Sequence, residues 1–163
     1  MDDLYHNAEL LGNSLLQRKL TICTAESCSG GGIAYALTAV PGSSAWFSYG
    51  WVTYSNEAKQ ALLGVPHELF EKHGAVSEEV VNAMALGALQ RAQADICVSV
   101  SGIAGPSGGT PEKPVGTVCF GFATPTLTKV ERLLFKGDRE SIRHQTIIHA
   151  LQECNRLVQS SFT

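Results

Sequence analysis

The sequence has no apolar run long enough to cross a membrane, and its N-terminus lacks the basic and apolar regions of a secretory signal. Charge is also scarce, since only 17% of the residues are charged and the formal net charge is −3. No general electrostatic attraction to nucleic acid or to a membrane surface is therefore expected. These absences predict a cytoplasmic protein whose partners include neither nucleic acid nor a membrane.

Paired metal-binding or disulfide-forming residues are missing as well. The five cysteines, at positions 23, 28, 97, 119 and 154, are odd in number and contain no Cys-x-x-Cys pair, so we expect reduced and mostly buried thiols. His144 and His149 do not have the i, i+4 spacing of zinc ligands on one helical face, and His67-Glu68 lacks the second histidine of H-E-x-x-H. The sequence thus predicts no metal and no cofactor.

Length and patterning predict one domain over residues 1–163, with enough hydrophobic residues (44%) to bury a substantial core. Helical patterns cover 3–19, 29–40, 55–63, 66–73, 80–93 and the segment from 137 onwards, and strand-like runs cover 21–24, 45–53, 96–100, 115–123 and 129–135. Helices and strands alternate first and strands cluster later. We therefore expect an α/β layered sandwich, with a mixed sheet flanked by helices.

The most informative segment is Thr24–Gly32, which places two possible nucleophiles, Ser27 and Cys28, and three glycines between a strand pattern and a helix pattern. A strand-to-helix turn exposes a side chain at the carboxyl edge of a sheet and directs free backbone N–H groups towards it. A hydroxyl or thiol there would gain an oxyanion site. The alternative is that Ser27 or Ser29 only caps the helix, which is the more frequent role of an isolated serine.

A second glycine-rich segment, Ser101–Thr110, also follows a predicted strand and should reach the same sheet edge as Ser27. Two such loops at one edge suggest a pocket. Gly102, Gly105 and Gly108 are evenly spaced and match neither the G-x-G-x-x-G nor the P-loop pattern. Backbone N–H groups of this loop could bind a nucleotide phosphate, but a plain surface loop fits the sequence equally well.

Lys59 is a candidate general base, because burial lowers the pKa of a lysine and allows it to accept the proton of a serine hydroxyl. Tyr54, at the preceding strand end, could orient that proton path. Spacing alone favours simpler roles. A lysine in a first helical turn is usually a solvated surface residue, and a tyrosine at a strand end usually lies at the edge of the core.

Several ordered motifs together resemble one known family. They are TAESCSGG (24–31), VPGSSA (40–45), VTYSNEAK (52–59), GAVSE (74–78), SGIAGP (101–106), EKPVGTV (112–118) and GDR (137–139). They span nearly the whole chain and resemble the CinA carboxyl-terminal domain family, in its stand-alone, nicotinamide mononucleotide deamidase form. The sequence departs from the expected family pattern at Ser29, where a threonine is expected, and at Ser107, where an aspartate is expected.

The resemblance implies an amidohydrolase that converts nicotinamide mononucleotide to nicotinate mononucleotide and ammonia, in pyridine nucleotide salvage. It implies a serine nucleophile assisted by lysine and tyrosine, which map onto Ser27, Lys59 and Tyr54. The expected substrate-binding residues are Cys28, Ser29, Gly30, Gly31, Ser101, Gly102, Gly105, Gly108, Thr110 and Arg139. A homo-oligomer is compatible with the sequence.

Two other interpretations remain open at this point. The same loops could form a nucleotide-binding or sensor module that does not hydrolyse its ligand. Alternatively, Cys28 could be the nucleophile of a different enzyme, because a thiol near a helix N-terminus has a lowered pKa. Lys113, Arg139 and Arg143 are candidates for binding a substrate phosphate, and pairing of Arg139 with Glu140 or solvent is an equal alternative for that residue.

Overall fold

The protein is described here by a computed structural model that covers residues 2–162. A five-stranded mixed sheet has the order β2-β1-β3-β4-β5, in which β2, β1 and β3 are parallel and β4 and β5 are antiparallel to their neighbours. The strands are β1 (Ile22–Glu26), β2 (Phe47–Val52), β3 (Ile96–Gly102), β4 (Thr117–Ala123) and β5 (Thr128–Leu134). The helices are α1 (Asp2–Arg18), α2 (Gly32–Thr38), α3 (Asn56–Leu63), α4 (His67–His73), α5 (Glu78–Ala92) and α6 (Arg139–Ser161), with a 3-10 turn at Ser43–Ala45.

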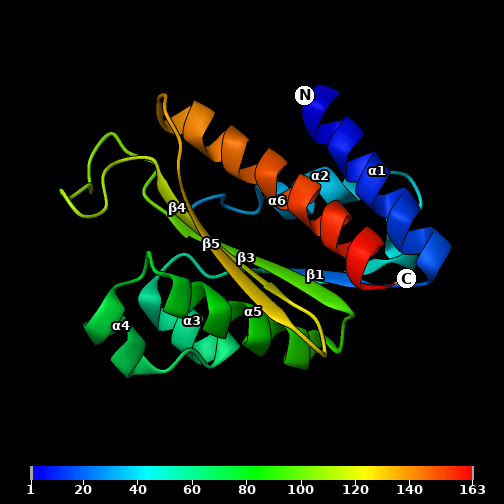
Figure 1. Cartoon of the computed structure of the whole chain (residues 1–163), viewed down its shortest axis with the longest axis horizontal. Helices are drawn as coiled ribbons and strands as arrows, with labels where there is room; N and C mark the ends of the chain where they lie inside the picture. The colour runs from blue at the N-terminus through cyan, green and yellow to red at the C-terminus, as the bar shows by residue number, and fades with distance from the viewer. Residues whose placement is uncertain (1, 163) are drawn as a thin grey trace.

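The helices form two layers, one on each face of the sheet (Figure 1). Helices α1, α2 and α6 cover one face, and α3, α4 and α5 cover the other. Strand side chains alternate between the faces, so Val98 and Val100 join the first core while Cys97 joins the second. The predicted layered α/β sandwich with a mixed sheet is therefore confirmed, and so is the burial of all five cysteines, which are free thiols.

The order of the strands creates a crevice between β1 and β3. The chain leaves β1 through α2 on one face to reach β2, and returns through α3–α5 on the other face to reach β3. Where the connections from two adjacent parallel strands leave in opposite directions, a crevice forms outside the carboxyl ends of the strands. Ligands of α/β proteins bind in such a crevice. Ser27 directly follows β1, and Ser101 and Gly102 end β3, so both predicted loops meet at this point.

The turn after β1 differs from the expectation. The strand runs on to Glu26, and α2 begins at Gly32, not near Ser29. Gly30 and Gly31 have φ angles of 61° and 90°, a left-handed conformation that favours glycine and delays the helix. Ser27, Cys28 and Ser29 are therefore held in an irregular turn.

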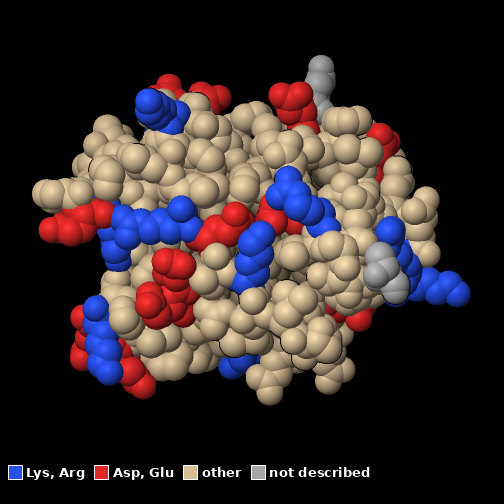
Figure 2. Space-filling view, viewed as in Figure 1, with Lys and Arg blue, Asp and Glu red and all other residues tan. Residues whose placement is uncertain are grey.

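The surface shows no single-signed patch on the face viewed in Figure 2, where acidic and basic side chains are intermixed. Within residues 2–162, no helix has both the length and the apolar character that crossing a membrane requires.

Candidate active site

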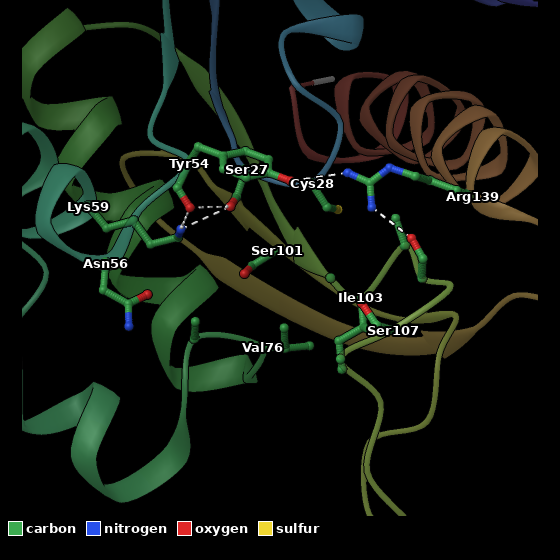
Figure 3. A pocket seen from close by; sticks show the side chains of 15 residues that line it. Ser27, Cys28, Tyr54, Asn56, Lys59, Val76, Ser101, Ile103, Ser107 and Arg139 are labelled. Atoms are coloured by element: carbon green, nitrogen blue, oxygen red, sulfur yellow. Dashed lines mark hydrogen bonds between the residues drawn. The ribbon is translucent and has the colours of Figure 1, made fainter.

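Ser27 and Lys59 are brought together although they lie far apart in sequence. The Lys59 ammonium donates a hydrogen bond to the Ser27 hydroxyl, with 2.9 Å between Nζ and Oγ (Figure 3). Ser27 comes from the turn after β1, and Lys59 from the first turn of α3, which Ser55 caps by accepting the N–H of Ala58. The pair therefore has the geometry of a nucleophile and its base.

Lys59 is buried, with 1% of its surface exposed, so the simpler expectation of a solvated lysine is wrong. Its ammonium donates to the backbone carbonyls of Thr53 (2.8 Å) and Tyr54 (3.1 Å) as well as to Ser27. Within residues 2–162 it has no carboxylate partner within salt-bridge distance. Burial lowers the pKa of Lys59 from 10.5 to about 8, so a usable fraction of the amine is neutral near physiological pH.

Tyr54 contacts the Ser27–Lys59 pair through its backbone carbonyl and not through its side chain. Its carbonyl lies 3.4 Å from the Ser27 hydroxyl and accepts the Lys59 ammonium. Its hydroxyl instead accepts a hydrogen bond from Arg139 (3.2 Å), and its side chain is well exposed at the pocket rim. The expectation of a core-edge tyrosine is therefore wrong.

A buried carboxylate that the sequence analysis overlooked organises the turn. Glu26 accepts the hydroxyl of Ser29 (2.6 Å) and the N–H groups of Ile33 (2.8 Å) and Ala34 (3.0 Å). Glu26 rather than a serine thus satisfies the N-terminal groups of α2, and Gly31, at the N-cap position, has no side-chain cap. The interpretation of Ser27 or Ser29 as the helix cap is therefore wrong. Burial raises the pKa of Glu26, and its hydrogen bonds oppose that shift.

The pocket at this point has a volume of about 280 Å³. Six of the ten predicted substrate-binding residues line it: Cys28, Ser101, Gly102, Gly105, Gly108 and Arg139. Ser29, Gly30 and Gly31 instead line a neighbouring hollow beside α6. Thr110 lines neither, and its hydroxyl accepts the N–H of Lys113. Ile103, Ala104 and Ser107 of the predicted glycine-rich loop also line it. Three further lining residues were not identified from the sequence: Asn56, Ala75 and Val76.

The three basic candidates have different positions. Arg139 lies at the pocket, where it donates to the Gly105 carbonyl (2.7 Å) and thereby joins the glycine loop to Tyr54. Lys113 donates to the His73 carbonyl (2.5 Å) and does not line the pocket. Arg143 binds the turn after Ser27 from the side of α6. Of these three candidates, Arg139 is thus the one that lines the pocket.

Cys28 does not have the properties of an activated thiol. It is buried, and burial raises its pKa to about 12. The expectation that a helix N-terminus lowers this pKa is therefore wrong, because loss of hydration outweighs the neighbouring N–H groups and cations. A thiolate nucleophile is disfavoured at this position.

One cluster elsewhere has ligand-forming groups close together. Side-chain atoms of Glu131, His149 and Glu153 lie within 4.8 Å of one another, on β5 and α6. The Glu153 carboxylate is already bound by Lys129 and Arg156. These cations would compete with a metal ion, and none of the five residues lines the pocket at Ser27.

Comparison with known proteins agrees with the motifs. Residues 5–158 match the sequence profile of the CinA C-terminal domain. The chain belongs to this family. Its fold also matches that of a CinA superfamily protein from Klebsiella pneumoniae 700603, with a TM-score of 0.93 and 36% identity over 96% of this chain and 98% of that one. A competence/damage inducible protein from Agrobacterium tumefaciens matches with a TM-score of 0.93 and 40% identity, over 95% of each chain.

Curated relatives fall into two lengths. The nicotinamide-nucleotide amidohydrolase PncC of Escherichia coli K12 is 53% identical over 92% of both chains. The PncC of Pseudomonas putida is 53% identical over 93% of this chain and 94% of its own. A putative competence-damage inducible protein of Symbiobacterium thermophilum is 54% identical over 91% of this chain, which spans only 37% of that longer protein.

Proposed function

We propose that this protein is a nicotinamide-nucleotide amidohydrolase that converts nicotinamide mononucleotide to nicotinate mononucleotide and ammonia. The observation that carries the proposal is the 2.9 Å contact between Ser27 and the buried Lys59, whose pKa burial lowers to about 8. The names of the two PncC relatives, which align over nearly their whole length, supply the substrate class. A place in pyridine nucleotide salvage in the cytoplasm is part of the proposal.

The reaction begins with proton transfer from Ser27 to the neutral Lys59 amine. The Ser27 oxygen attacks the carboxamide carbon, and the resulting oxyanion accepts a hydrogen bond from the N–H group of Cys28, which lines the pocket. This N–H group donates to no backbone carbonyl within residues 2–162. When the carbon–nitrogen bond breaks, the Lys59 ammonium returns its proton to the leaving nitrogen, and ammonia departs.

Water completes the cycle by attacking the acyl-enzyme, with Lys59 again accepting the proton. The released carboxylate is nicotinate mononucleotide, and Ser27 regains its hydroxyl. The Tyr54 carbonyl holds the Lys59 amine in place throughout the cycle. The Tyr54 hydroxyl and Arg139 lie at the edge of the pocket. We assign the substrate phosphate to Arg139 and the glycine-rich loop Ser101–Thr110.

The direct test is incubation of the purified protein with nicotinamide mononucleotide and measurement of ammonia and nicotinate mononucleotide. We expect equal amounts of both products, and none with the Ser27→Ala variant. Binding of the nucleotide without ammonia release would show a non-hydrolysing binding module. Ammonia release from another amide, but not from this nucleotide, would overturn the substrate assignment.

A further inference from the structure

The hydroxyl of Ser101 lies at the pocket without a hydrogen-bond partner, and the proposed cycle gives it no role. Ser101 lies near the end of β3, has 2% of its surface exposed, and lines the pocket. Among residues 2–162, its hydroxyl hydrogen-bonds to no other group, and Figure 3 shows its oxygen directed into the space beneath Ser27 in this view. Buried hydroxyls are normally paired, so one that is free at a pocket is available to a ligand.

Ser99, two residues earlier on β3, shows the contrast. Its side chain is fully buried, and its hydroxyl donates to the Val81 carbonyl in α5 (2.5 Å). Alternation along the strand places Ser101 on the same face, the one that α3, α4 and α5 cover. Ser99 therefore joins the sheet to a helix, whereas Ser101 borders the pocket into which α3 brings Lys59.

Strand pairing places Ser101 beside the nucleophile. Strands β1 and β3 are parallel, with Glu26 opposite Val100. The Ser27 N–H extends this pairing by donating to the Val100 carbonyl (3.1 Å). Ser27 and Ser101 are thus at the same level on neighbouring strands, which lie about 4.8 Å apart. A carboxamide whose carbon is attacked by the Ser27 oxygen comes within reach of the Ser101 hydroxyl.

The oxyanion formed by this attack has one backbone donor in the proposed cycle, the Cys28 N–H. Charge develops on the carboxamide oxygen, which can only accept hydrogen bonds, so any further stabilising group must be a donor. The three N–H groups of the Lys59 ammonium are already directed to the Ser27 hydroxyl and to two backbone carbonyls. The Ser101 hydroxyl is an uncommitted donor next to the nucleophile.

We propose that Ser101 is a catalytic residue for amide hydrolysis, whose hydroxyl donates a hydrogen bond to the carboxamide oxygen as the oxyanion forms. The inference rests on the proposed function. It gives Ser101 a role in the chemical step, where the family resemblance implied only substrate binding. Because the hydrogen bond strengthens as charge develops on the oxygen, its loss acts on kcat more than on KM.

The test compares Ser101→Ala with a matched control, Ser99→Ala, the same substitution on the same face of the strand. Ser101→Ala should lower kcat for ammonia release by about 10²–10³-fold, the effect of removing an oxyanion donor, and should change KM by less than about threefold. Ser101→Thr keeps a hydroxyl and should retain most of the native kcat. Ser99→Ala should keep kcat within about twofold and lower the melting temperature, because the Val81 carbonyl loses its donor.

An ester substrate distinguishes the carbonyl oxygen from the leaving nitrogen as the partner of Ser101. The methyl ester of nicotinate mononucleotide has the same carbonyl oxygen but no leaving nitrogen. Attack on this ester and hydrolysis of the acyl-enzyme both pass through an oxyanion, so Ser101→Ala should slow methanol release by a factor similar to that for ammonia release. Native ester turnover by Ser101→Ala would assign the hydroxyl to the leaving nitrogen and overturn the proposal.

Other outcomes would also overturn it. A raised KM with native kcat would make Ser101 a ligand of the bound substrate alone, and unchanged kinetics would leave it no part in the reaction. Should Ser101→Ala unfold, Ser101→Cys replaces it: a thiol is a weak donor, so kcat should still fall, and native kcat in this variant would contradict the proposal. Absence of ammonia release by the native protein would instead overturn the proposed function.

Discussion

Two buried charged side chains, Lys59 and Glu153, are equally inaccessible, at 1% exposure each, but have opposite surroundings. Lys129 and Arg156 neutralise the Glu153 carboxylate, with 2.5 Å between Lys129 Nζ and Oε1. Among residues 2–162, Lys59 has only neutral oxygen acceptors: one hydroxyl and two backbone carbonyls. A compensated buried charge is a structural element, whereas an uncompensated one next to a hydroxyl in a pocket is suited to proton transfer.

The lack of a counter-charge at Lys59 affects the stability of the fold as well as the chemistry of the site. Burial lowers the pKa of Lys59 from 10.5 to about 8, so the unfolded chain binds more protons between these pH values than the native protein does. The buried amine therefore destabilises the fold below about pH 8, and this penalty disappears as the pH rises from about 8 to 10.5.

The largest expected effect is at the nucleophile. Ser27→Ala should abolish ammonia release from nicotinamide mononucleotide, because no hydroxyl remains to form the acyl-enzyme. Cys28→Ala, the adjacent control, should keep most of the activity. Rapid inactivation by iodoacetamide together with an inactive Cys28→Ala variant would reverse the assignment of the nucleophile.

Removal of the base should come next. Lys59→Ala should lower kcat by at least about 100-fold with the fold intact, as expected for loss of a general base. Lys59→Met, which keeps an apolar stem without the amine, should be equally impaired and should melt at the native temperature or above it at pH 7. Near-normal turnover of either variant would mean that another group is the base.

A change at Glu153, whose charge is compensated, should lower the stability of the protein and leave its activity unchanged. Glu153→Gln removes the charge that binds Lys129 and Arg156 and should lower the free energy of unfolding by about 1.5–3 kcal/mol, the range for hydrogen bonds to charged groups. Its kcat and KM should stay within about twofold of the native values, measured beside thermal or urea unfolding. A selective loss of kcat without loss of stability would remove the distinction drawn between the two sites.

The smallest expected effect is that of chelation. Turnover should survive exhaustive EDTA treatment and gain little from added Zn²⁺ or Mg²⁺, since the proposed cycle has a nucleophile, a base and an oxyanion donor. Loss of activity on chelation, restored by a stoichiometric metal ion, would contradict the serine–lysine scheme. The Glu131–His149–Glu153 cluster would then be the first place to look for the ion.

Much of this arrangement could be predicted from the sequence because its signals are local. Strand patterns over 21–24 and 96–100 placed two polar loops at one sheet edge, and family motifs marked Ser27 and Lys59. Individual contacts could not be predicted, because they join distant segments. Arg143 binds a carbonyl 115 positions earlier in the chain.

Predictions made from side-chain type were incomplete at positions where a backbone group makes the contact. Tyr54 was expected to orient the proton path, and the group by which it contacts Lys59 and Ser27 is its backbone carbonyl. Glu26 was read as part of a motif around Ser27, although its buried carboxylate organises the start of α2. Side-chain chemistry read from a sequence does not reveal which backbone groups a fold leaves free or engaged.

The central claim, that the uncompensated Lys59 amine is the base, is tested most directly by the pH dependence of kcat/KM for ammonia release from nicotinamide mononucleotide. Only the neutral amine accepts the Ser27 proton, so kcat/KM should rise tenfold per pH unit below a pKa of about 8 and level off above it. The residual activity of Lys59→Ala should lack this transition. A native profile that is flat through this region, or the same transition in Lys59→Ala, would contradict the account.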